Sequence, residues 1–349
     1  MKVGIVGFPG AGKTTVFNAL TGLHAAVGGY GDPSKANLGT IKVPDARVDR
    51  LSAIFQPRKT THAECVFVDV PGGGDHSAGA LARGTLVQMR DAEALVQVVR
   101  AFPDPAAGAA AQPERDVENF KSELILADLA VIEKRLERVR KEHGKGPDVD
   151  LLERCHAALE SETPLRRVTL SAAEERALSG FGLVSRLPLL VLLNVEESCA
   201  GAPIPESIRT RLEAEAVLGL ALCAQIEMEI ASLDPGERGA FLADLGLAES
   251  ARDRFIQAAY ALLDLISFLT TGEDEVRAWP IRRGTTAVKA AGKVHSDIER
   301  GFIRAEVVAY DDFIRLGSEA RCREAGKLRL EGKEYVVQDG DIIHFRFNV

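Results

Sequence analysis

The residues best suited to chemistry stand near the start of the chain. Lys2–Val6 predicts a short buried strand, which leads into the spacing Gly7-x-x-x-x-Gly12-Lys13-Thr14 and then into a helix with an apolar face. In this context the glycines let backbone N–H groups surround a phosphate, the lysine brings a positive charge, and the threonine offers a hydroxyl to Mg²⁺. We therefore expect a nucleotide site whose phosphate contacts come from Gly10, Ala11, Gly12, Lys13, Thr14 and Thr15.

A second strand ends in a carboxylate that suits the metal side of such a site. Residues 65–68 are apolar and run into Asp69-Val-Pro-Gly72. In P-loop proteins an aspartate at this place holds Mg²⁺, and the N–H of the glycine three residues later meets the γ-phosphate. We therefore expect Asp69 to share the metal with Thr14, and Gly72 to contact phosphate.

A third segment, Leu187–Ser198, bears on the base that is bound. It predicts a buried strand whose polar end is Asn194-Val195-Glu196-Glu197, whereas guanine-binding P-loop proteins carry Asn-Lys-x-Asp there. Glu197 is one methylene longer than the aspartate that reads guanine, and Val195 lacks the long stem that lysine lays over the base. The carboxamide of Asn194 can pair with adenine N6 and N7. These residues weaken the case for guanine and permit adenine.

In this order, the motifs resemble the YchF/Obg-like ATPase family, and the likeness extends over nearly the whole chain. Residues 43–57, 122–139 and 223–247 are similar to its segments, and the region from "ISFLTTGEDEVRAW" to "DGDIIHFRFN" looks like its C-terminal TGS domain. The family's Asn-x-x-Glu pattern, matched by Asn194 and Glu197, implies a preference for ATP over GTP. The resemblance also implies that the loop at Ala224 covers the base from the other side.

The resemblance and the local patterns together predict an α/β architecture with an insertion. We expect a P-loop nucleotide-binding domain (1–115 and 187–275), an inserted helical coiled-coil arm (116–186) and a C-terminal ubiquitin-like β-grasp (TGS) domain (276–349). Apolar residues spaced three and four apart predict the seam of the arm, although packing of each helix on a core is the alternative. The seam residues are Ile125, Leu129, Ile132, Leu136 and Val139, with Leu152, Cys155 and Leu159 on a second helix.

Two further elements are expected towards the C-terminus. The nucleotide-binding domain should end in a helix at 252–269. The stretch "VVQDGDIIHFRF" should form two strands about a tight turn at Asp339-Gly340, because Asp-Gly is a favoured pair in short hairpin turns.

Three positions depart from the family pattern around the γ-phosphate. The switch threonine that completes the magnesium shell falls near Pro33, so that Ser34 is the nearest hydroxyl. Gly73 stands where Ras-type GTPases carry a glutamine that orients water. His76 lies in a rewritten loop and is the candidate catalytic residue, with a solvent-exposed loop histidine as the alternative. Hydrolysis without a positioned water-orienting group should be slow.

The composition of the chain restricts the classes of protein to which it can belong. The 349-residue chain carries a net charge of −8, which argues against a nucleic-acid-binding surface along its whole length. Five scattered cysteines without a CxxC pair favour a reducing compartment over a disulfide framework. Because no apolar run approaches the ~20 residues of a membrane span, we expect a cytoplasmic protein without a membrane partner.

The sequence therefore predicts a slow ATPase that uses Mg²⁺ and ATP. It is expected to act as a nucleotide-dependent switch on a ribosome- or RNA-associated partner, which it would meet through the arm and the TGS domain. Two alternatives stay open. One is a nucleotide-binding interaction module with negligible hydrolysis, and the other is a GTP-binding GTPase of the translation-factor type.

Overall fold

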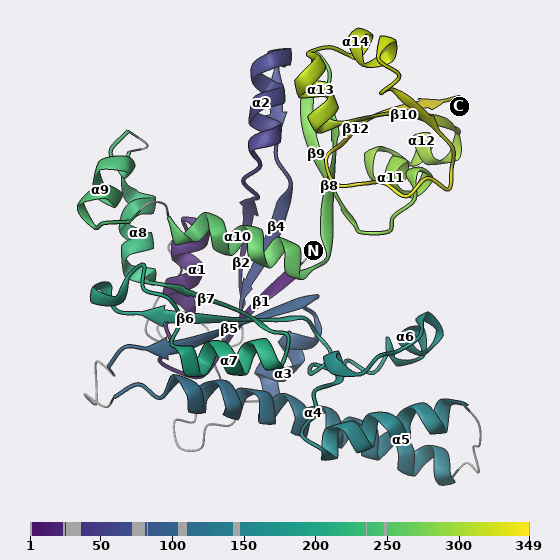
Figure 1. Cartoon of the computed structure of the whole chain (residues 1–349). Helices are drawn as coiled ribbons and strands as arrows, with labels where there is room; N and C mark the ends of the chain where they lie inside the picture. The colour runs from purple at the N-terminus through teal and green to yellow at the C-terminus, as the bar shows by residue number, and fades with distance from the viewer. Residues whose placement is uncertain are drawn as a thin grey trace. The chain divides into compact units, whose positions relative to one another are not determined.

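The structure is a computed structural model, drawn in Figure 1. It describes residues 2–23, 25, 36–71, 81, 83–103, 110–141, 147–234, 236–247 and 250–348. The chain divides into two compact units, Met1–Ile41 with Val66–Phe255, and Lys42–Cys65 with Ile256–Val349. The domain limits expected from the sequence (1–115 with 187–275, 116–186, and 276–349) stay a prediction, and the two units divide the chain at other residues.

The first unit is built on a six-stranded sheet in the order β2-β4-β1-β5-β6-β7. β1 runs parallel to β4 and β5, and β6 runs parallel to β5 and β7. Parallel strands need crossover connections, which the helices of this unit supply. The strands are β1 (Lys2–Val6), β2 (Asn37–Lys42), β4 (Glu64–Asp69), β5 (Ala94–Ala101), β6 (Leu189–Val195) and β7 (Leu218–Leu222).

The apolar runs of the central strands reflect burial on both faces, as in other parallel sheets. Against one face, Phe120 and Leu124 of α4 pack with Leu95 and Val191 of the sheet. On β4, the ring of Phe67 packs against Phe255 of α10, with 5.7 Å between the ring centroids. The helices of this part of the chain are α1 (Lys13–Thr21), α3 (Arg83–Arg90), α4 (Pro113–Lys141), α7 (Glu206–Ala214), α8 (Ala224–Ser232), α9 (Arg238–Asp244) and α10 (Ala251–Leu262), with the short helix η2 (Glu197–Cys199).

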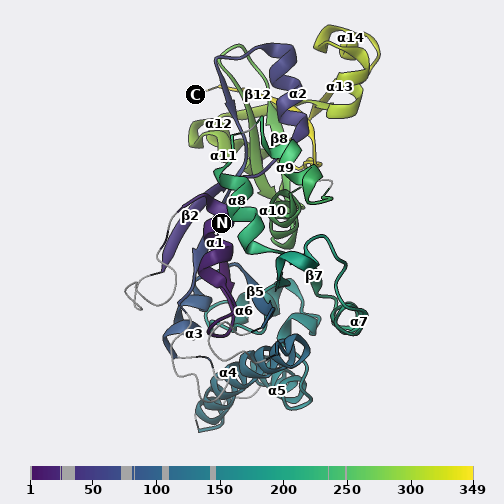
Figure 2. The same cartoon turned by 90° about the vertical axis from the view of Figure 1, so that its left-hand side faces the viewer.

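The helical arm grows out of α4, a helix of 29 residues. Its first half packs on the sheet, whereas its second half lies beside α5 (Pro147–Glu160), as Figures 1 and 2 show. η1 (Leu165–Arg167) and α6 (Ala172–Leu178) lead back to β6. The seam expected from the spacing is confirmed, because its residues share one apolar cluster: Ile125, Leu129, Ile132, Leu136, Val139, Leu152, Cys155 and Leu159.

The second unit holds another six-stranded sheet, in the order β11-β10-β12-β8-β9-β3. Helix α11 packs on it through Ala287, Ala290 and Ala291, which meet Ile266 and Phe268, and this gives the expected β-grasp arrangement. The strands are β3 (Lys59–Thr61), β8 (Leu265–Thr270), β9 (Glu275–Arg282), β10 (Phe302–Ala309), β11 (Arg329–Glu331) and β12 (Asp341–Phe347). The helices are α2 (Ala46–Phe55), α11 (Ala287–Val294), α12 (Ser296–Arg300), α13 (Tyr310–Leu316) and α14 (Glu319–Glu324).

Two expectations about the chain after residue 250 were partly wrong, although residues 251–262 are helical and Asp341–Phe347 forms the expected second strand. The helix expected at 252–269 ends at Leu262, and residues 265–270 form strand β8. Asp264 takes a left-handed conformation (φ 51°) that ends the helical turn, and the apolar run behind it pairs with β9. The stretch before Asp339-Gly340 is not a strand of a hairpin either, because Val336 makes only an isolated bridge to Thr286.

Among the described residues, no helix is both long enough and apolar enough to cross a membrane.

A buried carboxylate fastens α4 to the segment that leads from the arm into β6. Asp128 of α4 is fully buried, and its two oxygens accept hydrogen bonds from the N–H groups of Val184 and Ser185, each at 2.8 Å. Burial raises the pKa of Asp128, and the bonds from Ser185 and Val184 and the charge of Arg90 oppose that rise. The carboxylate thus supplies the acceptors for a chain segment that would otherwise bury unpaired donors.

Replacing Asp128 with alanine should lower the free energy of unfolding by about 2–4 kcal/mol, because two buried N–H groups lose their acceptors. Denaturation in urea would measure the change. Glu137→Ala, at an exposed position of the same helix, is the control and should stay within about 0.5 kcal/mol of the parent. Equal stability of the two variants would contradict the assigned role.

Candidate functional site

The polar residues singled out from the sequence collect at one edge of the first sheet. β1 ends where the glycine loop begins, β4 ends at Asp69, and β6 ends one residue after Asn194. β7 leads into α8, whose first residue is Ala224. Ligands of open parallel sheets bind at the carboxyl ends of the strands, which is where these residues lie.

The glycine loop joins β1 to the N-terminus of α1. Gly12 is the residue before the helix, with φ 85°, and a Cβ atom there would lie 2.4 Å from Nδ2 of Asn194. Both its conformation and its close approach to Asn194 therefore require glycine. The first N–H groups of α1, on Lys13, Thr14 and Thr15, have no acceptor within the helix, and the helix dipole favours an anion beside them.

The ammonium group of Lys13 is held inside this loop. The side chain is only 8% exposed, and its Nζ donates to the carbonyl oxygen of Phe8 at 3.0 Å. Burial lowers the pKa of Lys13, while the negative charge of Asp69 acts to raise it. A lysine ammonium has three donors, so this group can also donate to an anionic oxygen.

The two carboxylate oxygens of Asp69 differ in their hydrogen bonding. Its Oδ2 accepts from the hydroxyl of Thr14 at 2.9 Å and from Nδ2 of Asn37 at 3.2 Å. Its Oδ1 is buried and has no hydrogen-bond partner among the described residues. A buried carboxylate oxygen without a partner is costly, and a hydroxyl beside a carboxylate is the kind of oxygen set that Mg²⁺ prefers. The pair Thr14 and Asp69 therefore fits a magnesium ion or its bound water.

Asn37 is the residue at this site that the sequence reasoning missed. It is the first residue of β2, and its side chain reaches Asp69 across 32 positions of the chain. The only local signal was a polar amide at the start of a strand that follows the first switch segment. That signal does not distinguish a site residue from an ordinary strand end.

On the base side, Asn194 connects three elements. Its side chain is 4% exposed, its Nδ2 donates to the carbonyl oxygen of Ala11 at 3.1 Å, and its Oδ1 accepts from the N–H of Ala224 at 3.2 Å. The amide therefore ties the end of β6 to the glycine loop and to the start of α8. One N–H and one lone pair remain for a base, so pairing with adenine stays a prediction.

The two other predicted base residues differ in their surroundings. Val195 is partly buried against Cys223 and Ile226, whereas Glu197 is exposed in the short helix η2. Burial raises the pKa of the Cys223 thiol, and the negative charge of Glu197 adds to that rise. Glu197 stands three residues after Asn194, whose side chain contacts Ala224. The four predicted base residues thus belong to one corner of the site.

Three predicted site residues, Ser34, Gly72 and His76, lie outside the described residues, as do Pro33 and Gly73. Their assignments to metal, γ-phosphate and catalysis stay predictions.

Comparison with known families gives two matches that together span most of the chain. Residues 2–134 match the model described as "50S ribosome-binding GTPase". Residues 265–348 match the YchF-type GTPase C-terminal model, described as "Protein of unknown function (DUF933)". The first range contains the glycine loop and Asp69, and the second covers most of the β-grasp region.

Whole-chain relatives agree with these matches. The chain is 41% identical to the "Ribosome-binding ATPase YchF" of Bacillus subtilis over 368 residues, which covers 100% of both proteins. It is 39% identical to the protein of the same name from Escherichia coli O157:H7, covering 100% of this chain and 99% of that protein. The solved structure of the Schizosaccharomyces pombe YchF GTPase superposes with a TM-score of 0.88 at 30% identity, covering 99% of this chain and 97% of that one. The chain belongs to the YchF family.

Proposed function

We propose that this protein is a magnesium-dependent ATPase that hydrolyses slowly and acts as a nucleotide-dependent switch on the ribosome, in the cytoplasm. The observation that carries the proposal is the carboxylate of Asp69. One of its oxygens accepts from Thr14 while the other is buried without a partner, beside a glycine loop that holds the ammonium of Lys13. These groups suit a triphosphate with its metal better than any uncharged ligand.

The roles of the residues follow from their chemistry. The loop residues Gly10, Ala11 and Gly12 and the N-terminus of α1 at Thr15 would bind phosphate through backbone N–H groups, and Lys13 would neutralise the β- and γ-oxygens. Thr14 and Asp69 would hold Mg²⁺, which when bound stabilises negative charge on those oxygens. Gly72 and Ser34 are assigned to the γ-phosphate and the metal on sequence grounds alone.

ATP is the preferred nucleotide in this proposal. Val195 and Glu197 replace the lysine and aspartate that serve guanine, and the bacterial relatives are named ATPases. The name of the yeast structure, a GTPase, keeps GTP as the alternative. The ribosome is proposed as the partner because the bacterial relatives are named for binding it and match over their full length.

Slow turnover follows from the chain's own residues. Gly73 has no side chain to orient water, and His76 is the candidate that would approach the γ-phosphate instead. A nucleotide-binding module with negligible hydrolysis is therefore the second candidate, and the departures at Pro33 and Gly73 favour it.

Replacing Lys13 with alanine should weaken binding of a non-hydrolysable ATP analogue at least a hundredfold, because the buried positive charge beside the loop is lost. Calorimetric titration with Mg²⁺ would measure it. Lys134→Ala, on the exposed face of the arm, is the control and should bind like the parent. Unchanged binding by the Lys13 variant would overturn the assignment of the loop.

Changing Val195 to lysine together with Glu197 to aspartate should move the preference from ATP towards GTP by tenfold or more, about 1.4 kcal/mol. Asn194→Asp is the matched contrast, because its carboxylate would face the carbonyl oxygen of Ala11 and loosen the loop for both nucleotides. It should weaken ATP and GTP by similar factors. A double variant with the parent's selectivity would mean that the base is read elsewhere.

Ribosomes should accelerate ATP turnover by the purified protein at least tenfold, since a switch that lacks a water-orienting side chain needs groups supplied by its partner. Phosphate release under multiple-turnover conditions, with and without ribosomes, would measure this, and the Lys13→Ala protein gives the background. Tight, magnesium-dependent binding with no turnover in either condition would select the binding module instead.

A further inference from the structure

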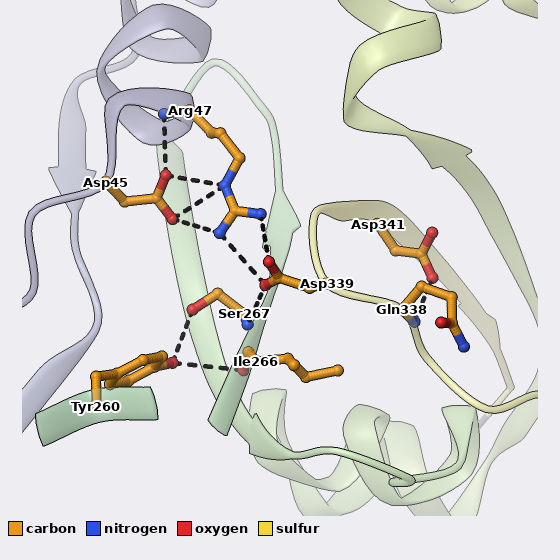
Figure 3. Close-up of polar contacts among 8 residues, drawn as sticks. All are labelled: Asp45, Arg47, Tyr260, Ile266, Ser267, Gln338, Asp339 and Asp341. Carbon is orange, nitrogen blue, oxygen red and sulfur yellow. Dashed lines mark hydrogen bonds and ion pairs between the residues drawn. The ribbon is translucent and has the colours of Figure 1, made fainter. Parts of the chain in front are cut away.

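Within the second unit, the guanidinium of Arg47 forms hydrogen bonds with two carboxylates that are far apart in the sequence (Figure 3). Nε of Arg47 donates to Asp45 at 2.9 Å and its Nη2 donates to the same carboxylate at 2.8 Å. On its other side, Nη1 and Nη2 donate to Asp339 at 2.9 and 3.3 Å. The guanidinium fork is thus used on both edges, and its side chain is 27% exposed.

Both carboxylates are fixed by the backbone as well as by the arginine. Asp45 precedes α2 and accepts from the N–H of Arg47 at 2.9 Å, so it caps the helix that carries its own partner. Asp339 accepts from the N–H of Ser267 on β8 at 2.9 Å. The next residue, Gly340, donates its N–H to the carbonyl oxygen of Ser267 at 2.9 Å. The arginine therefore links the start of α2 to β8 through a turn that is itself bound to β8.

A glycine sets the shape of the turn against which Arg47 lies. Gly340 has φ 83°, a conformation that other residues rarely adopt. A Cβ atom at this position would lie 2.9 Å from Nη1 of Arg47. The guanidinium therefore lies against the backbone of Gly340.

The two ends of α2 are held in different ways. At the C-terminal end, the ring of Phe55 stacks on Phe313 with 5.5 Å between centroids. At the N-terminal end, Arg47 borders a cavity of about 250 Å³ whose lining includes Tyr260 and Ser267. The two ends of α2 are therefore held by different kinds of contact, an apolar ring stack at one end and charged hydrogen bonds beside a cavity at the other.

The position of this helix in the chain connects it to the candidate site. β2 starts at Asn37, which donates to Asp69, and it ends at Lys42, three residues before Asp45. β4 starts at Glu64 and ends at Asp69 itself. Residues 43–63, which contain α2 and β3, are therefore the connection between two strands that both lead to the proposed metal-side carboxylate.

We propose that Arg47 is a latch by which the Asp69 site controls the β-grasp sheet: it holds α2 on the Asp339-Gly340 turn, and ligand binding at Asp69 tightens that grip through β2 and β4. The proposed coupling, in which ligand binding at Asp69 tightens the contacts of Arg47, rests on the proposed nucleotide binding. The proposed latch, in which Arg47 holds α2 on the turn, does not. Arg47 acts here as a positioning residue, since its contacts are to Asp45 and Asp339 and not to the nucleotide site.

Hydrogen exchange of the full chain, followed by mass spectrometry, tests both the latch and the coupling. Without nucleotide, Arg47→Ala should raise exchange at least tenfold in the peptides that contain Ser267 and Gly340. Arg58→Ala is the matched control: Arg58 also pairs an α2-side residue with the C-terminal part, at 3.2 Å from Asp274, but both side chains are more than four-fifths exposed. Exchange in the Arg58 variant should equal that of the parent, and equal exchange in the Arg47 variant would overturn the latch.

The coupling is tested by adding Mg²⁺ and a non-hydrolysable ATP analogue, with binding measured separately by calorimetry. In the parent, exchange at the same peptides should fall at least threefold, and Arg47→Ala should abolish this change while still binding the analogue. Binding without any change in exchange would overturn the coupling alone. Absence of binding to the parent would overturn the proposed function and the coupling together, while the nucleotide-free comparison still decides the latch.

Two milder substitutions, Arg47→Lys and Asp339→Asn, keep the test decisive if the Arg47→Ala protein fails to fold. Lysine keeps the charge but cannot make the two-sided fork, and asparagine keeps the acceptor for Ser267 while removing the charge. Both should give exchange between the parent and Arg47→Ala. Values equal to the parent for both variants would contradict the latch.

Discussion

The geometry of the first unit depends on how the buried carboxylate of Asp69 is satisfied. Thr14 and Asn37 donate to the same oxygen, so a hydroxyl from α1 and an amide from β2 converge on the end of β4. The second oxygen is left buried without a partner among the described residues. The ammonium of Lys13 is buried nearby and attracted to this charge. One incompletely satisfied charge thus lies at the end of β4 and another lies in the glycine loop. A bound phosphate and metal would offset the free-energy cost of burying them, so ligand binding should also stabilise the fold.

The amide of Asn194 has a comparable place on the base side, and it changes how that residue should be interpreted. From the sequence, its carboxamide was a candidate for reading adenine. In the structure its two ends hold the carbonyl of Ala11 and the N–H of Ala224, and Gly12 is confined to glycine by the same side chain. Selectivity between purines would then rest more on Val195 and Glu197, with Asn194 setting the distance between loop and base.

The parts that were predictable are those encoded within a few residues. The strand at Lys2–Val6, the helix that follows the glycine loop and the α4–α5 seam were confirmed because each is set by local spacing and composition. The segment 265–269 was assigned to a helix because a short apolar run fits either helix or strand, and its pairing with β9 decided the outcome. Asn37 could not be found because its partner is 32 residues away, and Asp339 lies 292 residues from Arg47. Neither pair leaves a periodic trace in the sequence.

The two elements that lead away from the site differ in how readily they can move. α4 is anchored at its start by Phe120, whose ring meets Phe8 of the glycine loop edge-on at 6.2 Å, and further along by Asp128. Moving such a helix would open a packed core and leave the buried N–H groups of Val184 and Ser185 without an acceptor. α4 is therefore better suited to carry the arm rigidly. The start of α2 is held instead by charged hydrogen bonds beside a cavity. Partly exposed ion pairs form and break at a smaller free-energy cost than packed apolar contacts, so the start of α2 can respond to ligand binding more readily than the arm.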